Sequence, residues 1–266
     1  MRRAIKFFAF FGELAVAILF STGSAQAGPS GVTVTGDFQS ELGCFSDWQP
    51  DCTVTGMMKS PIDGIWRATL ILPSGDYSYV GTYDGSFDTT YGAHGEFFGA
   101  NITLHQPSEQ PVNFYFDENS HWLTDNVNST IAVLAADFQS ELGCVSDWSP
   151  SCMLSWLKDV DGDGIYTYEA MLDPGTYQTV VTLNESFDVT YYPPGGGNYV
   201  FEAIGNPVKF SFNAATHVLT IDNGAIAAPV PAPPVWLMMI AGFGAIGAVL
   251  RRNRRMTRHL ETKTGM

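Results

Sequence analysis

Asp37-Phe-Gln-Ser-Glu-Leu-Gly-Cys44 is repeated letter for letter as Asp137-Phe-Gln-Ser-Glu-Leu-Gly-Cys144, one hundred residues later in the chain of 266 residues. The identity continues on the C-terminal side of the stretch, where Ser-Asp-Trp, Pro and Cys recur at 46–48, 50 and 52 and at 146–148, 150 and 152. Towards the end of the repeat the shift falls to 96 residues, since His121 answers to His217. A unit of this size is a domain rather than one turn of a solenoid. The sequence therefore predicts two tandem domains, residues 32–126 and 131–222.

Within each copy, apolar and polar residues alternate with the period of a half-buried β-strand. The residues expected to face the core are Trp66, Ala68, Leu70 and Leu72 in the first copy and Tyr166, Tyr168, Ala170 and Leu172 in the second. Turn residues such as Asp84-Gly85 and Asp173-Pro-Gly175 separate these runs. Short strands and turns over about 100 residues are typical of an antiparallel β-sandwich of the immunoglobulin-like type. The predicted fold class is therefore all-β.

The four cysteines occur in two identical spacings, Cys44 with Cys52 and Cys144 with Cys152. An oxidising compartment favours disulfides, and no further Cys or His lies near enough in sequence to complete a metal site. We therefore expect one local disulfide in each copy.

Charge is distributed unevenly along the chain. Residues 28–250 contain four Lys and Arg residues against 25 Asp and Glu residues, a net charge of −21. Phosphate binding needs clustered basic side chains, so nucleic acid is excluded as a partner of this region. The remaining bases lie close to the two ends of the chain and indicate targeting segments instead.

The N-terminal residues 1–27 have the pattern of a secretory signal peptide. Arg2, Arg3 and Lys6 precede an apolar run, and Ala25-Gln-Ala27 supplies a small-x-small cleavage site before Gly28. An uncleaved N-terminal anchor is the alternative. Either interpretation predicts that the two domains are exported.

The C-terminal end has three parts: a Pro-rich spacer at 223–234, an uncharged apolar segment at 235–250 and a basic tail at 251–266. The apolar segment is expected to form a hydrophobic helix of roughly 24 Å, slightly short of the hydrocarbon core of a bilayer. The arginines after it would keep the tail in the cytoplasm. This order resembles the PEP-CTERM sorting signals processed by exosortase-type proteases. The resemblance implies a Gram-negative bacterial protein delivered to the cell surface or extracellular matrix, and a permanent membrane anchor is the alternative.

The repeated stretch itself resembles the pullulanase-type accessory module of starch-debranching enzymes. Further matching stretches are Gly64-Ile-Trp66, Leu72-Pro-Ser-Gly-Asp-Tyr77, Gly85-Ser-Phe-Asp88, Gly99-Ala-Asn-Ile102 and His121-Trp-Leu-Thr-Asp-Asn126. The resemblance covers both predicted domains. It implies an immunoglobulin-like sandwich and binding to an α-glucan such as starch or glycogen.

Aromatic side chains beside carboxylates are candidates for carbohydrate binding, because sugar rings stack on flat apolar rings and sugar hydroxyls bind to polar groups. The candidates are Trp48, Asp47, Tyr83, Phe87, Asp88, Tyr91 and Trp122 in the first copy, and Trp148, Asp147, Phe187, Asp188 and Tyr191 in the second. Alternatively, Trp48 packs on its own disulfide and Phe87 fills the core. Trp66 and Trp156 are expected in the core. Trp122 and the Gly99-Ala-Asn101 loop have no counterpart in the second copy, so the first copy is expected to bind better.

The sequence does not indicate catalysis or a cofactor. It has no G-x-S-x-G elbow and no H-E-x-x-H motif, and so many acids are present that paired carboxylates carry no signal. Asp159, Asp161 and Asp163 supply the first half of a calcium-binding loop, but Ala170 stands where a bidentate Glu belongs. An Asp-Gly hairpin turn explains the same residues.

These features together predict an exported, non-catalytic carbohydrate-binding protein with an exosortase-type protease and the membrane as transient partners. The alternative is a structural or adhesive surface protein in which the domains are spacers or protein-contact units.

Overall fold

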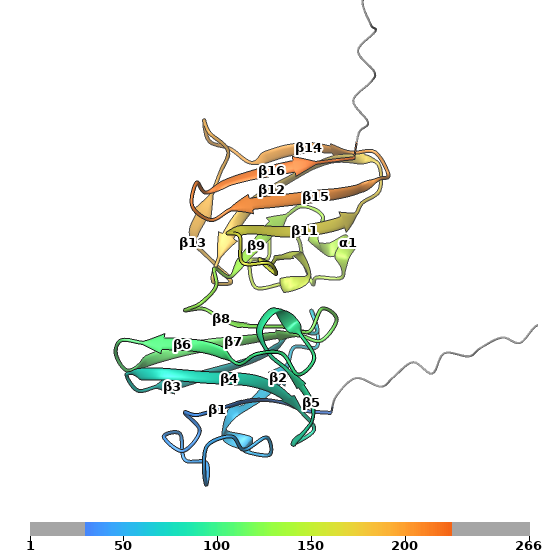
Figure 1. The fold of residues 1–266 in the computed structure, drawn as a ribbon. Coiled ribbons are helices and arrows are strands. Elements are labelled where there is room, and N and C mark those ends of the chain that lie inside the picture. The colour runs from blue at the N-terminus through green and yellow to red at the C-terminus, as the bar shows by residue number, and fades with distance from the viewer. Residues whose placement is uncertain (1–29, 225–266) are drawn as a thin grey trace, which may run out of the picture. The chain divides into compact units, whose positions relative to one another are not determined.

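A computed structural model describes residues 30–224, which divide into two compact units between Ser129 and Thr130 (Figure 1). The predicted signal peptide, the hydrophobic segment 235–250, the basic tail and nearly all of the Pro-rich spacer lie outside the described residues. Within residues 30–224, no helix is long and apolar enough to span a membrane.

The first domain consists of eight strands and two single-turn 3-10 helices. The strands are β1 (Val32–Gly36), β2 (Gly56–Lys59), β3 (Trp66–Leu72), β4 (Gly75–Tyr83), β5 (Ser86–Tyr91), β6 (Ile102–Gln106), β7 (Gln110–Asp117) and β8 (Trp122–Asp125), and the helices are η1 (Thr53–Thr55) and η2 (Ala93–Gly95).

All strand pairs of this domain are antiparallel, and they form two sheets that share one strand. On one side, β4 pairs with β1 along one edge and with β5 and β6 along the other. On the other side the order is β2, β3, β7 and β8. Strand β2 pairs with β1 through Met57 and with β3 through Met58, so it passes from one sheet to the other.

The core of the first domain is built from the facing sides of these sheets. Val34, Tyr79 and Leu104 come from one sheet and pack with Leu72 and Phe114 from the other. Apolar burial of this kind stabilises a two-layer β-sandwich, which is the architecture predicted from the alternation of residues. In β3 that alternation is confirmed, because Trp66, Leu70 and Leu72 are buried while Thr69 and Ile71 are exposed.

The second domain repeats this arrangement with its own core, so each domain has the features of an independently folding unit. Its strands are β9 (Ala132–Ala136), β10 (Trp156–Leu157), β11 (Ile165–Met171), β12 (Gly175–Leu183), β13 (Ser186–Tyr191), β14 (Tyr199–Ala203), β15 (Pro207–Asn213) and β16 (Val218–Asp222). The short helices are α1 (Gln139–Leu142) and η3 (Met153–Ser155). One sheet holds β9, β10, β12, β13 and β14, and the other holds β11, β15 and β16.

The turns and disulfides follow the sequence prediction. Asp84 and Gly85 have φ values of 52° and 70° and form the two-residue turn between β4 and β5, as a hairpin with right-handed strand twist requires. Cys44 is bonded to Cys52 and Cys144 to Cys152, so the expected local disulfide is confirmed in each domain.

Candidate functional site

The repeated stretch forms a compact loop that is organised by one buried glutamine. Gln39 is fully buried, and its Nε2 donates hydrogen bonds to the Gln49 carbonyl at 2.9 Å and to Thr55 Oγ1 at 2.7 Å. Its Oε1 accepts a 2.7 Å hydrogen bond from the Gln49 backbone N–H. Gln139 makes the same set of contacts in the second domain, with Ser149 and Ser155 as partners. This glutamine therefore fixes the path of the chain on both sides of the tryptophan in each loop.

Asp47 and Asp147 are also part of this framework. Oδ1 of each accepts a 2.7 Å hydrogen bond from the backbone N–H of Ser40 or Ser140. One carboxylate oxygen of each residue therefore has a structural role that the sequence does not predict. The other oxygen has no protein partner within the described residues.

The loop holds Trp48 and Trp148 in the same unusual conformation. Both have a φ of 55°, and their backbone N–H groups donate to the carbonyls of Gly36 and Ala136 at 3.0 and 2.9 Å. A left-handed conformation costs a residue with a Cβ roughly 1–2 kcal/mol. Both side chains are half-buried, and within residues 30–224 neither makes a ring contact or a side-chain hydrogen bond. Each ring is therefore held partly open to solvent by backbone contacts that recur in the two domains.

The second aromatic group lies on β4 and the edge strand β5. The rings of Tyr83 and Tyr91 are 5.3 Å apart and half-buried. Phe87 is 44% exposed and Asp88 is exposed, so the alternative that Phe87 fills the core is wrong. Burial, and then the neighbouring Tyr91, raise the pKa of Tyr83 above its ordinary value. Its buried hydroxyl has no hydrogen-bond partner among residues 30–224.

The corresponding strand of the second domain is β13. Phe187 is 50% exposed and Asp188 is exposed, whereas Tyr191 is half-buried and stacks on His217 with 4.3 Å between ring centroids. Trp48 makes no ring contact with Tyr83 or Phe87 in the described part of the first domain. The sequence candidates thus form two separate groups in each domain rather than one site.

Trp122 differs from the other candidates. It is 8% exposed and begins β8, whose four residues are all buried, and the 3-10 helix η2 packs against this strand. Its ring therefore does not present a face at the surface of the domain. The core positions expected for Trp66 and Trp156 are confirmed, with exposures of 5% and 2%.

Two exposed aromatic residues of the first domain were not among those predicted from the sequence. Phe97 and Phe98 are 58% and 60% exposed, and their ring centroids are 4.4 Å apart. The sequence signal was an adjacent pair of phenylalanines in the stretch between Tyr91 and Ile102, and this pair is missing from the glycine-rich counterpart in the second copy.

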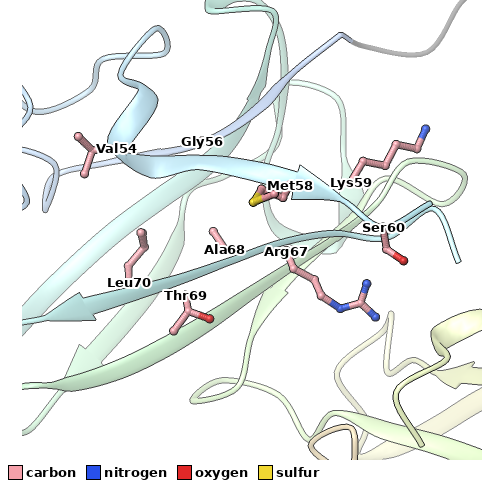
Figure 2. A pocket seen from close by; sticks show the side chains of 9 residues that line it. All are labelled: Val54, Gly56, Met58, Lys59, Ser60, Arg67, Ala68, Thr69 and Leu70. Atoms are coloured by element: carbon pink, nitrogen blue, oxygen red, sulfur yellow. The ribbon is translucent and has the colours of Figure 1, made fainter. Parts of the chain in front are cut away.

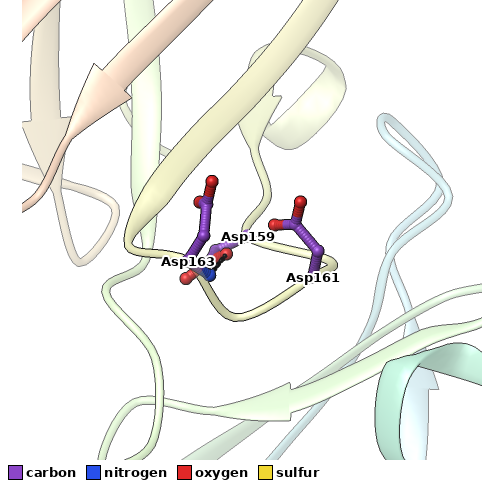
Figure 3. A group of neighbouring side chains, drawn as sticks. All are labelled: Asp159, Asp161 and Asp163. Atoms are coloured by element: carbon purple, nitrogen blue, oxygen red, sulfur yellow. Dashed lines mark hydrogen bonds between the residues drawn. The ribbon is translucent and has the colours of Figure 1, made fainter.

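The three aspartates of the possible calcium loop do lie together, before β11 (Figure 3). Their carboxylate oxygens are within 4.8 Å of one another. Asp159 accepts the backbone N–H groups of Asp163 and Gly164, both at 3.0 Å, and Asp163 accepts that of Ile165 at 2.7 Å. These hydrogen bonds account for the turn without an ion.

A surface hollow of about 510 Å³ lies between β2 and β3 of the first domain (Figure 2). It arises because β2 pairs with β3 only as far as Met58 and Arg67 and then joins β1. It is lined by Val54, Gly56, Met58, Lys59, Ser60, Arg67, Ala68, Thr69 and Leu70. None of the residues predicted for carbohydrate binding lines this hollow.

Comparison with known protein families finds one family that matches both domains. The pullulanase X25 domain matches residues 31–123 and, a second time, residues 131–219. The chain belongs to the pullulanase X25 domain family. The expected likeness to pullulanase-type accessory modules is therefore confirmed for both X25 domains.

Two amylopullulanases and one solved pullulanase are similar to this chain. It is 28% identical to an amylopullulanase of Thermoanaerobacter thermohydrosulfuricus over an alignment of 228 residues, and this alignment covers 81% of this chain and 15% of the relative. It is 29% identical to an amylopullulanase of Thermoanaerobacterium thermosulfurigenes over an alignment of 196 residues, and this alignment covers 69% of this chain and 10% of the relative. A solved pullulanase from Bacillus acidopullulyticus matches with 27% identity over 38% of this chain and 13% of that chain, with a TM-score of 0.33. The chain thus spans a small part of the length of these proteins.

Proposed function

We propose that this chain is an exported, non-catalytic carbohydrate-binding protein whose two immunoglobulin-like X25 domains bind α-glucan or a related exopolysaccharide. In this proposal residues 1–27 direct export. An exosortase-type protease cuts near the Pro-rich spacer, and the domains reach the cell surface or the extracellular matrix of a Gram-negative bacterium. The match to accessory domains of amylopullulanases supports the carbohydrate class.

The observation that carries the proposal is the duplicated, partly open tryptophan. Trp48 and Trp148 keep the same φ of 55° and the same backbone hydrogen bond in domains that otherwise differ at many positions. Strained residues of this kind persist where the surrounding structure holds them, and they are concentrated at binding sites. A ring fixed in this way can stack on the apolar face of a glucose unit with little loss of side-chain entropy on binding.

The charge of the domains favours a neutral glycan. With 25 acids and four bases between residues 28 and 250, the domains repel polyanions. Carboxylates such as Asp88 and Asp188 are exposed and can accept hydrogen bonds from sugar hydroxyls.

A pull-down with insoluble starch tests the proposal. Protein spanning residues 28–225, which keeps both complete domains, should sediment with starch granules and be released by soluble maltooligosaccharide. Cellulose serves as the control polysaccharide. Folded protein that stays in the supernatant with every α-glucan would contradict the proposal.

A structural or adhesive role is the second candidate, and exposed apolar side chains favour it. Phe45, which directly follows Cys44 in the first disulfide loop, is 97% exposed, and Met58, which lines the hollow of Figure 2, is 81% exposed. Exposed apolar side chains of this size can serve in protein contacts. Self-association of residues 28–225 in the absence of glucan would favour this candidate.

A further inference from the structure

We propose that Tyr91, Phe97, Phe98 and His121 form an aromatic platform that binds hexopyranose rings of a neutral α-glucan and makes the first domain the stronger binder. The inference rests on the proposed function and assigns to that function a site and a ligand-facing pair of residues, Phe97 and Phe98.

The loop that carries the platform is held by its own backbone. Gly92 and Gly99 donate hydrogen bonds to the Glu96 carbonyl at 3.1 and 3.0 Å, and Ala93 donates to the Ala100 carbonyl at 2.8 Å. A Cβ at Gly92 would lie 2.3 Å from the carbonyl oxygen of Ala100, so only glycine permits this closure. The loop is therefore rigid without any contribution from the phenylalanine side chains.

The two phenylalanine rings lie beside a stacked pair of rings, Tyr91 and His121. Tyr91 lies parallel to His121, with 4.1 Å between centroids and an interplanar angle of 5°. Phe97 pairs with Tyr91 as a β-bridge, and the two rings are 5.7 Å apart. Phe98 has a φ of 51°, and its N–H donates to the Thr90 carbonyl at 2.8 Å. The backbone therefore fixes both phenylalanines in place while each residue stays more than half exposed.

A buried polar group without a hydrogen-bond partner in the described part of the chain lies next to His121 in the sequence. Trp122 directly follows His121, is 8% exposed, and its Nε1–H has no hydrogen-bond partner within the described residues. Such a group is uncommon in a folded protein, and an ordered water is one way in which it can be satisfied.

The second domain keeps the stacked tyrosine–histidine pair but lacks the two phenylalanines of the platform. Tyr191 stacks on His217 as Tyr91 does on His121, with centroids 4.3 Å apart. The connection that follows is three residues shorter, since β14 begins at Tyr199 where the shift of the first half of the repeat would place residue 202. This connection reads Pro-Pro-Gly-Gly-Gly at 193–197 in place of the two phenylalanines. The expected advantage of the first domain thus follows from this loop and not from Trp122.

The chemistry of the occupant follows from the surface around the rings. Two exposed apolar rings offer stacking area. Glu96, in the same loop, is exposed, and its carboxylate can accept hydrogen bonds from sugar hydroxyls. The first domain carries only two bases, Lys59 and Arg67, and neither belongs to this loop. A neutral polyhydroxylated chain suits this surface, whereas an acidic polysaccharide or an anionic membrane does not.

The test compares substitutions of the platform with a matched control. Phe97→Ala combined with Phe98→Gly removes both rings, and glycine tolerates the positive φ at position 98. Ile71→Ala is the control, because Ile71 is 60% exposed in the same domain and lies outside the loop. Binding of maltoheptaose to residues 28–225 is measured by calorimetry, with melting temperatures recorded for all three proteins.

We expect the double variant to bind maltoheptaose about 5- to 100-fold more weakly, as for loss of ring stacking elsewhere, with a melting temperature within about 2 °C of the parent. Ile71→Ala should bind like the parent. Parent-like binding by the double variant would overturn the platform and leave the proposed function standing. If the double variant does not fold, Phe98→Gly alone must show weaker binding, and parent-like affinity overturns the platform. No binding by the folded parent protein would overturn both proposals.

Discussion

Replacing Gln39 by Ala tests whether one buried amide organises the loop that presents Trp48. Gln39 is fully buried and makes three short side-chain hydrogen bonds, two to the backbone of Gln49 and one to Thr55 Oγ1. Thr55 is also fully buried, and its hydroxyl would lose the 2.7 Å hydrogen bond from Gln39 and keep only a 3.5 Å bond to the Cys52 carbonyl. That loss carries a desolvation cost of about 1–3 kcal/mol. The two bonds to the half-buried Gln49 contribute about 0.5–1.5 kcal/mol each, because water can replace part of them. The sum is a loss of roughly 2–6 kcal/mol.

Differential scanning calorimetry of residues 28–225 measures this loss, because the two domains can unfold as separate transitions. Gln39→Ala should lower the transition of the first domain, and Gln139→Ala should lower that of the second. Ser40→Ala is the control, since the Ser40 side chain is exposed and its backbone N–H still reaches Asp47. A Gln39→Ala protein whose transitions stay within about 0.5 kcal/mol of the parent would refute this account of the loop.

Trp48→Ala should weaken glucan binding by about 1–3 kcal/mol, as for stacking of rings elsewhere, and should leave the melting temperature of the first domain unchanged. A lowered melting temperature of the first domain would show that the ring packs in the loop instead. Burial raises the pKa of Tyr168 to about 12, so the folded state keeps a proton that the unfolded state loses near pH 10. The second domain should therefore lose roughly 2–3 kcal/mol of stability as the pH rises from 10 to 12, and Tyr168→Phe should abolish that part of the pH dependence in denaturant titrations. Protein recovered from medium or cell surface should have an intact mass that begins near Gly28 and lacks residues 251–266, and recovery with that tail attached would favour a membrane anchor.

The sequence was sufficient to predict the strands, turns and disulfides, because each of these depends on local chemistry. The alternation in β3, the Asp84-Gly85 turn and the Cys44 to Cys52 spacing specify structure within a few residues. The site was harder to predict, because exposure depends on contacts distant in sequence. Trp122 was expected at the surface, but η2 packs against its strand and the residue is buried.

The role of polar residues in the repeated stretch was equally hidden from the sequence. Gln39 is a residue type that usually lies at the surface, yet it is fully buried because Gln49 and Thr55 satisfy its amide. Phe97 and Phe98 illustrate the reverse case, since apolar residues are expected in a core and both are exposed. In each case the decisive fact is which groups the folded chain brings together.

Electrophoresis of residues 28–225 in native gels with increasing amylopectin tests glucan binding most directly. The two-domain protein should be retarded in proportion to the polysaccharide, and more strongly than either domain alone, because the second contact becomes intramolecular. A variant with both Trp48→Ala and Trp148→Ala should migrate closer to its position in a gel without polysaccharide. If the folded two-domain protein migrates identically with and without amylopectin and glycogen, glucan binding is contradicted and a structural role is favoured.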